Sequence, residues 1–201
     1  MPYHITARCI NREWFSTSPE RNWEIFSRNL YLLHHGFDIL IHAFVMMSNH
    51  YHLLASAPRL NMSEGMAYFN RESSRDLTRE SQRINRAFAG RFFRSRIGNP
   101  HYFLNCYKYV YKNPVKAGLA DNCEVYPYST LSGLLGRQRL LIPVAHDDTL
   151  FGDVEGTLAW LNQPVDEGDW DAVRRALRRR EFQLAKDRSF RRMHRLEYAL
   201  L

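Results

Sequence analysis

The sequence predicts an α+β fold, with an antiparallel sheet in the order β-α-β-β-α-β-α, ferredoxin-like or RRM-like, and helices on one face. Two observations predict it. Strand-like segments, in which apolar residues alternate with others, are interleaved with segments whose apolar residues recur at helical spacing. The second and third strand-like segments follow each other after a short connection, which an antiparallel pair allows and a parallel pair does not.

The first half of the chain supplies three of the expected strands and one helix. Residues 3–9 contain β-formers and predict the first strand. Ser18 can cap the helix that follows, and Gly36 is expected to end it. Residues 37–45 then alternate as a strand with one strongly apolar face, and residues 50–54 predict its antiparallel neighbour.

Two helices and the last strand follow. Ser63 can cap a helix that runs towards Ile84. Residues 92–97 alternate again and predict the final strand of the sheet. Asn99 begins a further helix, which we expect to end near Pro114, with a continuation of one turn left open.

Beyond residue 130 the periodic signals weaken, so we expect a main domain over residues 1–132 and an extension over residues 133–201. Asp169 can cap a helical, strongly basic segment over residues 170–184. From Asp171 to the last residue the chain has ten Lys and Arg against four Asp and Glu. Most of the positive charge of the protein therefore lies in this extension.

The composition is that of an ordinary globular protein with an excess of positive charge. The 201 residues carry a formal charge of +7, which favours a polyanionic partner such as nucleic acid. The three cysteines form no CxxC pair, and no signal peptide or membrane-length apolar run is visible, so we expect a cytoplasmic protein without a membrane partner. No GxxxxGK[ST] sequence is present, so no nucleotide cofactor is expected.

His50 and His52 are the first candidate site residues. They are two apart on an expected strand, so both imidazoles project from the same face. Together they can offer two neutral nitrogens to one metal ion. The alternative is a chance pair, in which one histidine fills a polar niche of the core.

Tyr109 and Asn113 are the second candidates. They are four residues apart on an expected helix and therefore share one face. A phenol attacks phosphorus poorly unless it is activated, and a divalent cation on the phosphate supplies that assistance. The Asn113 carbonyl oxygen is a hard ligand suited to Mg²⁺ or Mn²⁺. The alternative is an aromatic core stripe followed by the common helix terminator Asn-Pro.

Residues 42–54, followed roughly sixty residues later by residues 109–119, resemble the single-tyrosine HUH transposases. The resemblance is closest to the branch associated with repetitive extragenic palindromes. Residues 126–130 resemble the aromatic-Ser segment of that branch, and residues 3–8 resemble its opening strand. The similarity covers about residues 3–132, which would make this part a catalytic nuclease and transposase domain.

The resemblance implies a role for each candidate. His50, His52 and Asn113 would be ligands of a divalent metal ion, Mg²⁺ or Mn²⁺, and Tyr109 would be the nucleophile. Ser48 departs from the family, which commonly has proline there. The implied enzyme is a transposase that nicks single-stranded or hairpin DNA, including palindromic repeats, through a 5′-phosphotyrosine. A 3′-hydroxyl then reseals the strand.

Basic side chains near these candidates and in the extension are expected to bind DNA phosphates. Each could instead belong to a solvated surface. The candidates are Arg94, Arg96, Lys108, Lys112, Lys116, Arg174, Arg175, Arg178 and Arg179.

Two other functions remain open from the sequence. One is a domesticated DNA-binding protein that keeps the fold without nicking. The other is a hydrolase in which a metal-bound histidine pair directs a water molecule. The sequence also leaves a monomer and a homodimer equally open.

Overall fold

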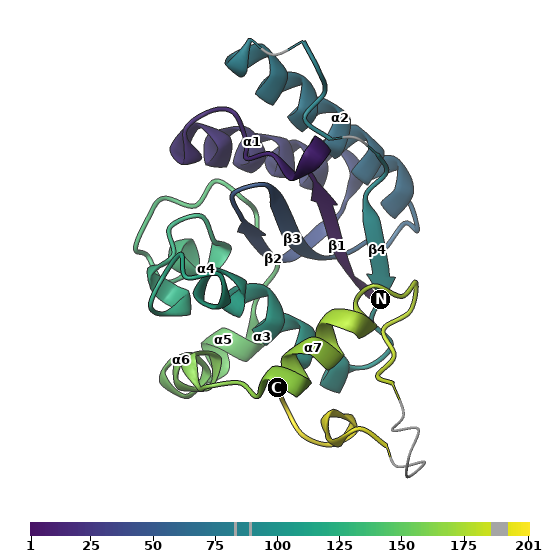
Figure 1. Ribbon diagram of the computed structural model, residues 1–201, viewed down its shortest axis with the longest axis vertical. Coiled ribbons are helices and arrows are strands. Elements are labelled where there is room, and N and C mark those ends of the chain that lie inside the picture. Colours follow the sequence, from purple (N-terminus) through teal and green to yellow (C-terminus); the bar gives the residue numbers. More distant parts are fainter. Residues whose placement is uncertain (83, 89, 186–192) are drawn as a thin grey trace.

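The computed structural model contains a four-stranded antiparallel sheet in the order β2-β3-β1-β4 (Figure 1). It describes residues 1–82, 84–88, 90–185 and 193–201. The strands are β1 (Pro2–Arg8), β2 (Leu40–Met46), β3 (His50–Ser56) and β4 (Phe93–Arg96). This strand order, with a helix between β1 and β2 and another between β3 and β4, confirms the expected ferredoxin-like α+β fold.

Helices α1 (Pro19–Phe37) and α2 (Met62–Ser81) cover one face of the sheet (Figure 1). Ser18 caps α1 as predicted, through its side-chain oxygen and the Arg21 N–H. The helix continues through Gly36 and ends at Asp38, which adopts a left-handed φ of 52°. Helix α2 begins after Asn61 rather than at Ser63. The helices exist as predicted, and their ends differ by up to three residues, which is usual for boundaries predicted from sequence.

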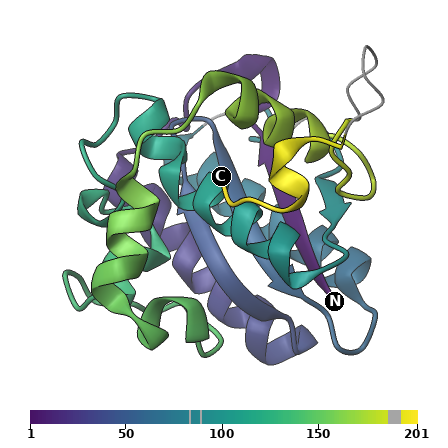
Figure 2. The same ribbon diagram turned by 90° about the horizontal axis from the view of Figure 1, so that it is seen from below.

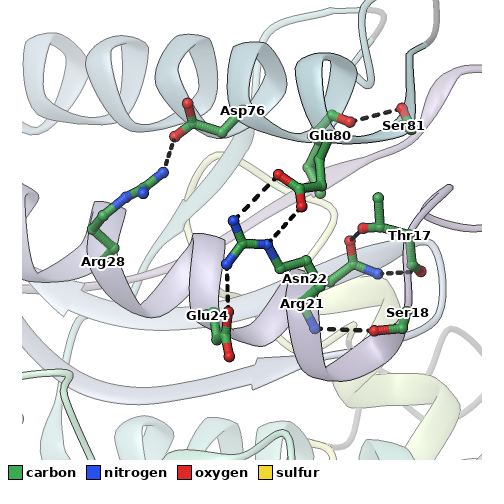
Figure 3. A network of polar contacts seen from close by, with 10 residues as sticks. Thr17, Ser18, Arg21, Asn22, Glu24, Arg28, Asp76, Glu80 and Ser81 are labelled. Atoms are coloured by element: carbon green, nitrogen blue, oxygen red, sulfur yellow. Dashed lines mark hydrogen bonds and ion pairs between the residues drawn. The ribbon is translucent and has the colours of Figure 1, made fainter.

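Ion pairs join α1 to α2 along their exposed side (Figure 3). The Arg21 guanidinium contacts the Glu80 carboxylate at 2.9 Å, and the Arg28 guanidinium contacts Asp76 at 2.7 Å. Exposed pairs of this kind contribute at most about 1 kcal/mol each. The apolar contacts of both helices with the sheet therefore provide most of the stability of this layer.

Helix α3 (Pro100–Lys116) packs on the opposite face of the sheet, against β2 and β3 (Figure 2). The expectation of helices on one face is thus wrong. A register shift between Ile41 and Ala43 changes which residues of β2 face which side, so Ala43 and Val45 face α3. Both faces of the central strands are apolar, and both need a cover.

The extension wraps around α3 as short helices (Figures 1 and 2). These are α4 (Thr130–Leu134), α5 (Asp148–Gly152), α6 (Val154–Asn162) and α7 (Glu167–Ala176). The basic helix is thus shorter than residues 170–184, and Asp166 caps it in place of Asp169. The extension shares an apolar core with α3, so the boundary at residue 132 stays a prediction.

After α7 the chain extends along the edge of β4. The Arg96 N–H donates to the Arg180 carbonyl at 2.9 Å, and the Phe182 N–H donates to the Arg96 carbonyl at 2.8 Å. Four basic residues counted in this tail, namely Lys186, Arg188, Arg191 and Arg192, lie outside the described residues. In the part of the chain that the structure describes, no helix is long and apolar enough to cross a membrane.

Candidate active site around Tyr109

His50 and His52 lie on β3 and project from the face of the sheet that α3 covers. Their ring centroids are 5.0 Å apart. His52 is buried and His50 is half-buried. The alternation of strand residues therefore brings the two imidazoles together as predicted.

Tyr109 lies on α3 directly across from His52. The two rings meet edge to face, with centroids 5.7 Å apart and an interplanar angle of 89°. One turn further along α3, the Asn113 amide nitrogen donates to the Tyr109 carbonyl at 2.6 Å. The described contacts include none between Asn113 and either imidazole. The fold thus brings Tyr109 to the histidine pair and leaves Asn113 one helical turn away.

His4 is a third imidazole at this site, which the sequence analysis did not single out. Its Nε2 lies 2.9 Å from His52 Nδ1, and both rings are buried. In the antiparallel pairing of β1 with β3, Thr6 is opposite His52, so His4 is its diagonal neighbour on the same face. Only the strand pairing, which the sequence did not define residue by residue, could have revealed this contact.

All three imidazoles are neutral at neutral pH. Burial lowers the pKa of His50 to about 4 and that of His4 to about 3, and it holds the pKa of His52 well below its usual value. Charge repulsion from Arg8 adds to the effect of burial at His50 and His52. Neutral rings keep a lone pair, which a metal ligand requires.

The donor set fits a divalent cation. His50 Nδ1 donates to the Asn49 side-chain oxygen at 2.8 Å, so its Nε2 carries the lone pair. His52 Nε2 is buried and has no hydrogen-bond partner among the described residues. Among those residues no three His, Cys, Asp or Glu side chains group around one metal position. Asn113, which the resemblance implies as the third ligand, instead donates its amide to the Tyr109 carbonyl.

Trp170 of α7 covers the tyrosine. Its ring centroid lies 4.5 Å from that of Tyr109, which is only 6% exposed. Lys116 of α3 holds α7 in place, because its ammonium lies 5.7 Å over the Trp170 ring and pairs with Glu167. No pattern in the sequence indicated that the extension would close the site.

Burial raises the pKa of the Tyr109 phenol, and nearby cations act against that rise. Arg174 opposes it most, followed by the Asn113 amide, Arg178 and Arg8. Arg8 is opposite His50 in the strand register and therefore faces the site. Two of the basic residues expected in the extension, Arg174 and Arg178, thus lie near enough to lower the pKa of the phenol, but burial outweighs them and the pKa stays raised.

The expectation that Lys108 and Lys112 contact DNA phosphates at the surface is wrong, because both side chains are buried. They are 1% and 4% exposed. The Lys108 ammonium lies 5.4 Å over the Trp160 ring, and Lys112 donates to the carbonyls of Leu161 and Asn162. The extension covers this side of α3, which the helical spacing alone could not show. Lys116 remains exposed at the end of the row.

Arg94 and Arg96 share one face of β4, as predicted. This face of the sheet is opposite to the face that carries the histidines. The two arginines pair with Ile5 and Tyr3 of β1, which point to the α1–α2 layer, while Ser95 pairs with His4. The expectation that these arginines lie near the metal ligands is therefore wrong. Arg175 and Arg179 are exposed on and just after α7.

The fold and the site define a class: an antiparallel α+β domain in which a histidine pair on a strand faces a tyrosine on a helix. The model of one family, transposase IS200 like, matches residues 1–113. The chain belongs to this family.

Solved structures also match this chain, and one with a TM-score above 0.5 shares its fold. One is the REP-associated tyrosine transposase bound to a REP hairpin, with 19% identity and a TM-score of 0.56 over 72% of this chain and 86% of that chain. The other is a candidate transposase from Deinococcus radiodurans, with 12% identity and a TM-score of 0.41 over 55% of this chain and 88% of that chain. Among curated proteins no match is found.

Proposed function

We propose that this protein is a DNA strand transferase that cuts and rejoins single-stranded or hairpin DNA, with Tyr109 as the nucleophile. The observation that carries the proposal is the edge-to-face contact of Tyr109 with His52 across the sheet–helix interface. Membership of a transposase family supports the substrate class. The similarity in fold to a transposase bound to a DNA hairpin supports it further.

The chemistry follows from the groups present. The Tyr109 Oη attacks a phosphodiester phosphorus, the phenolic proton leaves to solvent, and the bond to the 3′ oxygen breaks. A 5′-phosphotyrosine and a free 3′-hydroxyl result, and attack by a 3′-hydroxyl reverses the step. Arg174, Arg178 and Arg8 offset the negative charge that builds up around the phenol.

A divalent cation held by His50, His52 and Asn113 would stabilise charge on the scissile phosphate. Mg²⁺ and Mn²⁺ suit an amide oxygen, and neutral imidazoles suit Mn²⁺ better than Mg²⁺. The lone pair of His52 Nε2, which has no partner in the described part of the chain, supports this assignment.

The test is incubation with labelled hairpin DNA and Mn²⁺, followed by denaturing electrophoresis. We expect a covalent protein–DNA band that disappears in Tyr109→Phe. Tyr111→Phe, two residues away on α3, is the matched control and keeps the band. DNA binding without an adduct would favour a DNA-binding protein without nicking. Cleaved DNA with free ends and little effect of Tyr109→Phe would favour a hydrolase.

A further inference from the structure

A groove of about 1670 Å³ lies between α2 and β4, on the α1–α2 side of the sheet. Its described lining includes eight arginines and a single acid, Glu181. We infer that this arginine groove binds an unpaired stretch of the DNA strand, at a distance from the cutting site. The inference rests on the proposed function, because it takes DNA to be the substrate.

One wall of the groove is a row of arginines on α2. Arg71, Arg75 and Arg79 recur every four residues, so they follow one another along the helix at steps of about 6 Å. Glu72 pairs with Arg71 and Arg75 and offsets part of their charge. Among the described residues no acid pairs with Arg79. The row therefore keeps a net positive charge, which suits a chain of phosphates.

The other wall comes from the sheet edge and the extension. Arg94 and Arg96 of β4 point into the groove, and Arg180 joins them where the extension pairs with β4. Arg96 is partly neutralised by Glu181, whereas the Arg94 guanidinium donates to Ser63 across the groove entrance. Positive charge thus flanks the groove on both sides.

Between the walls the lining is apolar and aromatic. The lining includes the rings of Tyr3 and Phe92, the Arg94 guanidinium lies 5.5 Å over the Tyr3 ring, and Ile84 is fully exposed. Aromatic rings inside a basic groove fit unpaired bases, which stack on aromatic side chains. A duplex keeps its base faces stacked inside and would leave these rings in water.

Asn70 adds a polar contact in the lining. Its Oδ1 accepts from the Tyr51 hydroxyl at 2.7 Å, so the side chain is fixed. Its Nδ2 is buried and lacks a partner among the described residues, and Asn70 is only 9% exposed. A buried donor without an acceptor is costly. The side chain is therefore a fixed part of the groove floor, and its shielded Nδ2 is out of reach of a bound strand in this arrangement.

The groove can be tested by DNA binding in EDTA, where no cutting occurs. The probe is a labelled oligothymidylate of about 16 nucleotides, a typical site size for such surfaces, followed by anisotropy. The variant is Arg75→Ala with Arg79→Ala. The matched control is Arg137→Ala with Arg139→Ala, which removes the same charge from exposed positions outside the groove.

We expect the groove variant to bind roughly tenfold more weakly, with a salt dependence less steep by about 1.4, because two phosphate contacts are lost. Equal losses in the groove variant and the control would overturn the inference. So would a duplex of the same length that competes as strongly as the single strand.

The adduct assay separates this inference from the proposed function. At saturating hairpin DNA the groove variant should still form the Tyr109 adduct, and Tyr109→Phe should still bind oligothymidylate in EDTA. A wild-type protein that binds the oligonucleotide in the groove but never forms an adduct refutes the proposed function alone. Normal adduct formation with unchanged binding by the groove variant refutes the groove alone.

Discussion

At the scale of single residues, the contact between His4 and His52 has the clearest chemical consequence. One hydrogen joins His4 Nε2 to His52 Nδ1, so one ring donates and the other accepts. If His52 donates through Nδ1, its Nε2 keeps a lone pair for a cation. The other tautomer would place a proton on Nε2 and block it. We predict that His4 accepts this hydrogen, which would make it a positioning residue for the ligand form of His52.

His4→Phe should weaken Mn²⁺ binding about ten- to hundredfold, because the acceptor for His52 Nδ1–H is lost. The measurement is the electron paramagnetic resonance signal of free Mn²⁺ without DNA, with a thermal melt to check folding. His4→Gln keeps an acceptor and should recover part of the affinity. His146→Asn, an exposed histidine away from the site, is the control. Wild-type affinity in His4→Phe would contradict the role.

Lys108 leads to a prediction about stability. Burial, together with the charge of the nearby Lys112, lowers its pKa from 10.5 to about 8. Below about pH 8 Lys108 is protonated in both the folded and the unfolded chain, so the buried charge lowers the stability of the folded state by its full amount. Between about pH 8 and 10.5 only the folded chain releases it, so stability rises with pH.

Lys108→Met should therefore raise the melting temperature at pH 7 and reduce the difference in stability between pH 8 and 10. The methionine keeps the packing against Trp160 without a buried charge. Thermal unfolding of both proteins across this pH range is the measurement. A lower melting temperature for the variant at pH 7 would show that the ammonium–ring contact outweighs burial.

At the scale of elements, α7 limits access to the nucleophile. A phosphodiester must reach the Tyr109 Oη in line, and the Trp170 ring lies 4.5 Å from the ring of Tyr109, which is only 6% exposed. The contact of Lys116 with Glu167 and Trp170 joins the two helices near the end of α3. Displacement of α7 is therefore expected to precede the reaction with DNA.

Trp170→Ala should speed formation of the Tyr109 adduct roughly fivefold, since an aromatic pair contributes about 1 kcal/mol to the closed arrangement. Trp170→Phe keeps a stacked ring and should react at nearly the wild-type rate. Single-turnover adduct formation at saturating DNA is the measurement. A slower reaction in Trp170→Ala would instead make the indole part of the reactive arrangement.

At the scale of the whole molecule, the extension completes the fold. Trp170, Val173, Phe182 and Leu184 are buried in the same apolar cluster as Tyr107 and Val110 of α3. The positive surface also has two parts, because Arg174 and Arg178 act at the tyrosine while the arginine groove lies on the other side of the sheet.

Removal of residues after Gln163 should therefore destabilise the main domain by more than about 3 kcal/mol, as loss of a buried aromatic residue alone does. Urea unfolding of the full and shortened chains gives the comparison. An unchanged unfolding midpoint would show that residues 1–163 fold independently. In that case only DNA binding should weaken.

Local patterns were sufficient for the strands and the long helices of the main domain, and they missed the short helices α4, α5 and α6. Strand and helix periods predicted the order of the sheet and its helices, and the Ser18 and Asn99 caps were placed correctly. The spacing of His50 and His52 placed them on one face because a strand alternates. Tyr109 was correctly expected on a helix, and the resemblance indicated its partners.

The sequence by itself determined that His50 and His52 share one face of a strand and that Tyr109 lies on a helix, because a strand and a helix each fix the faces of their own side chains. Only the tertiary structure decided which other parts of the chain those faces contact. The shift at Ile41 and Ala43, the packing of α3 on the second face, the His4–His52 contact and the Trp170 cover all join residues distant in sequence. Such contacts depend on strand register and on the path of the extension, which no local period encodes.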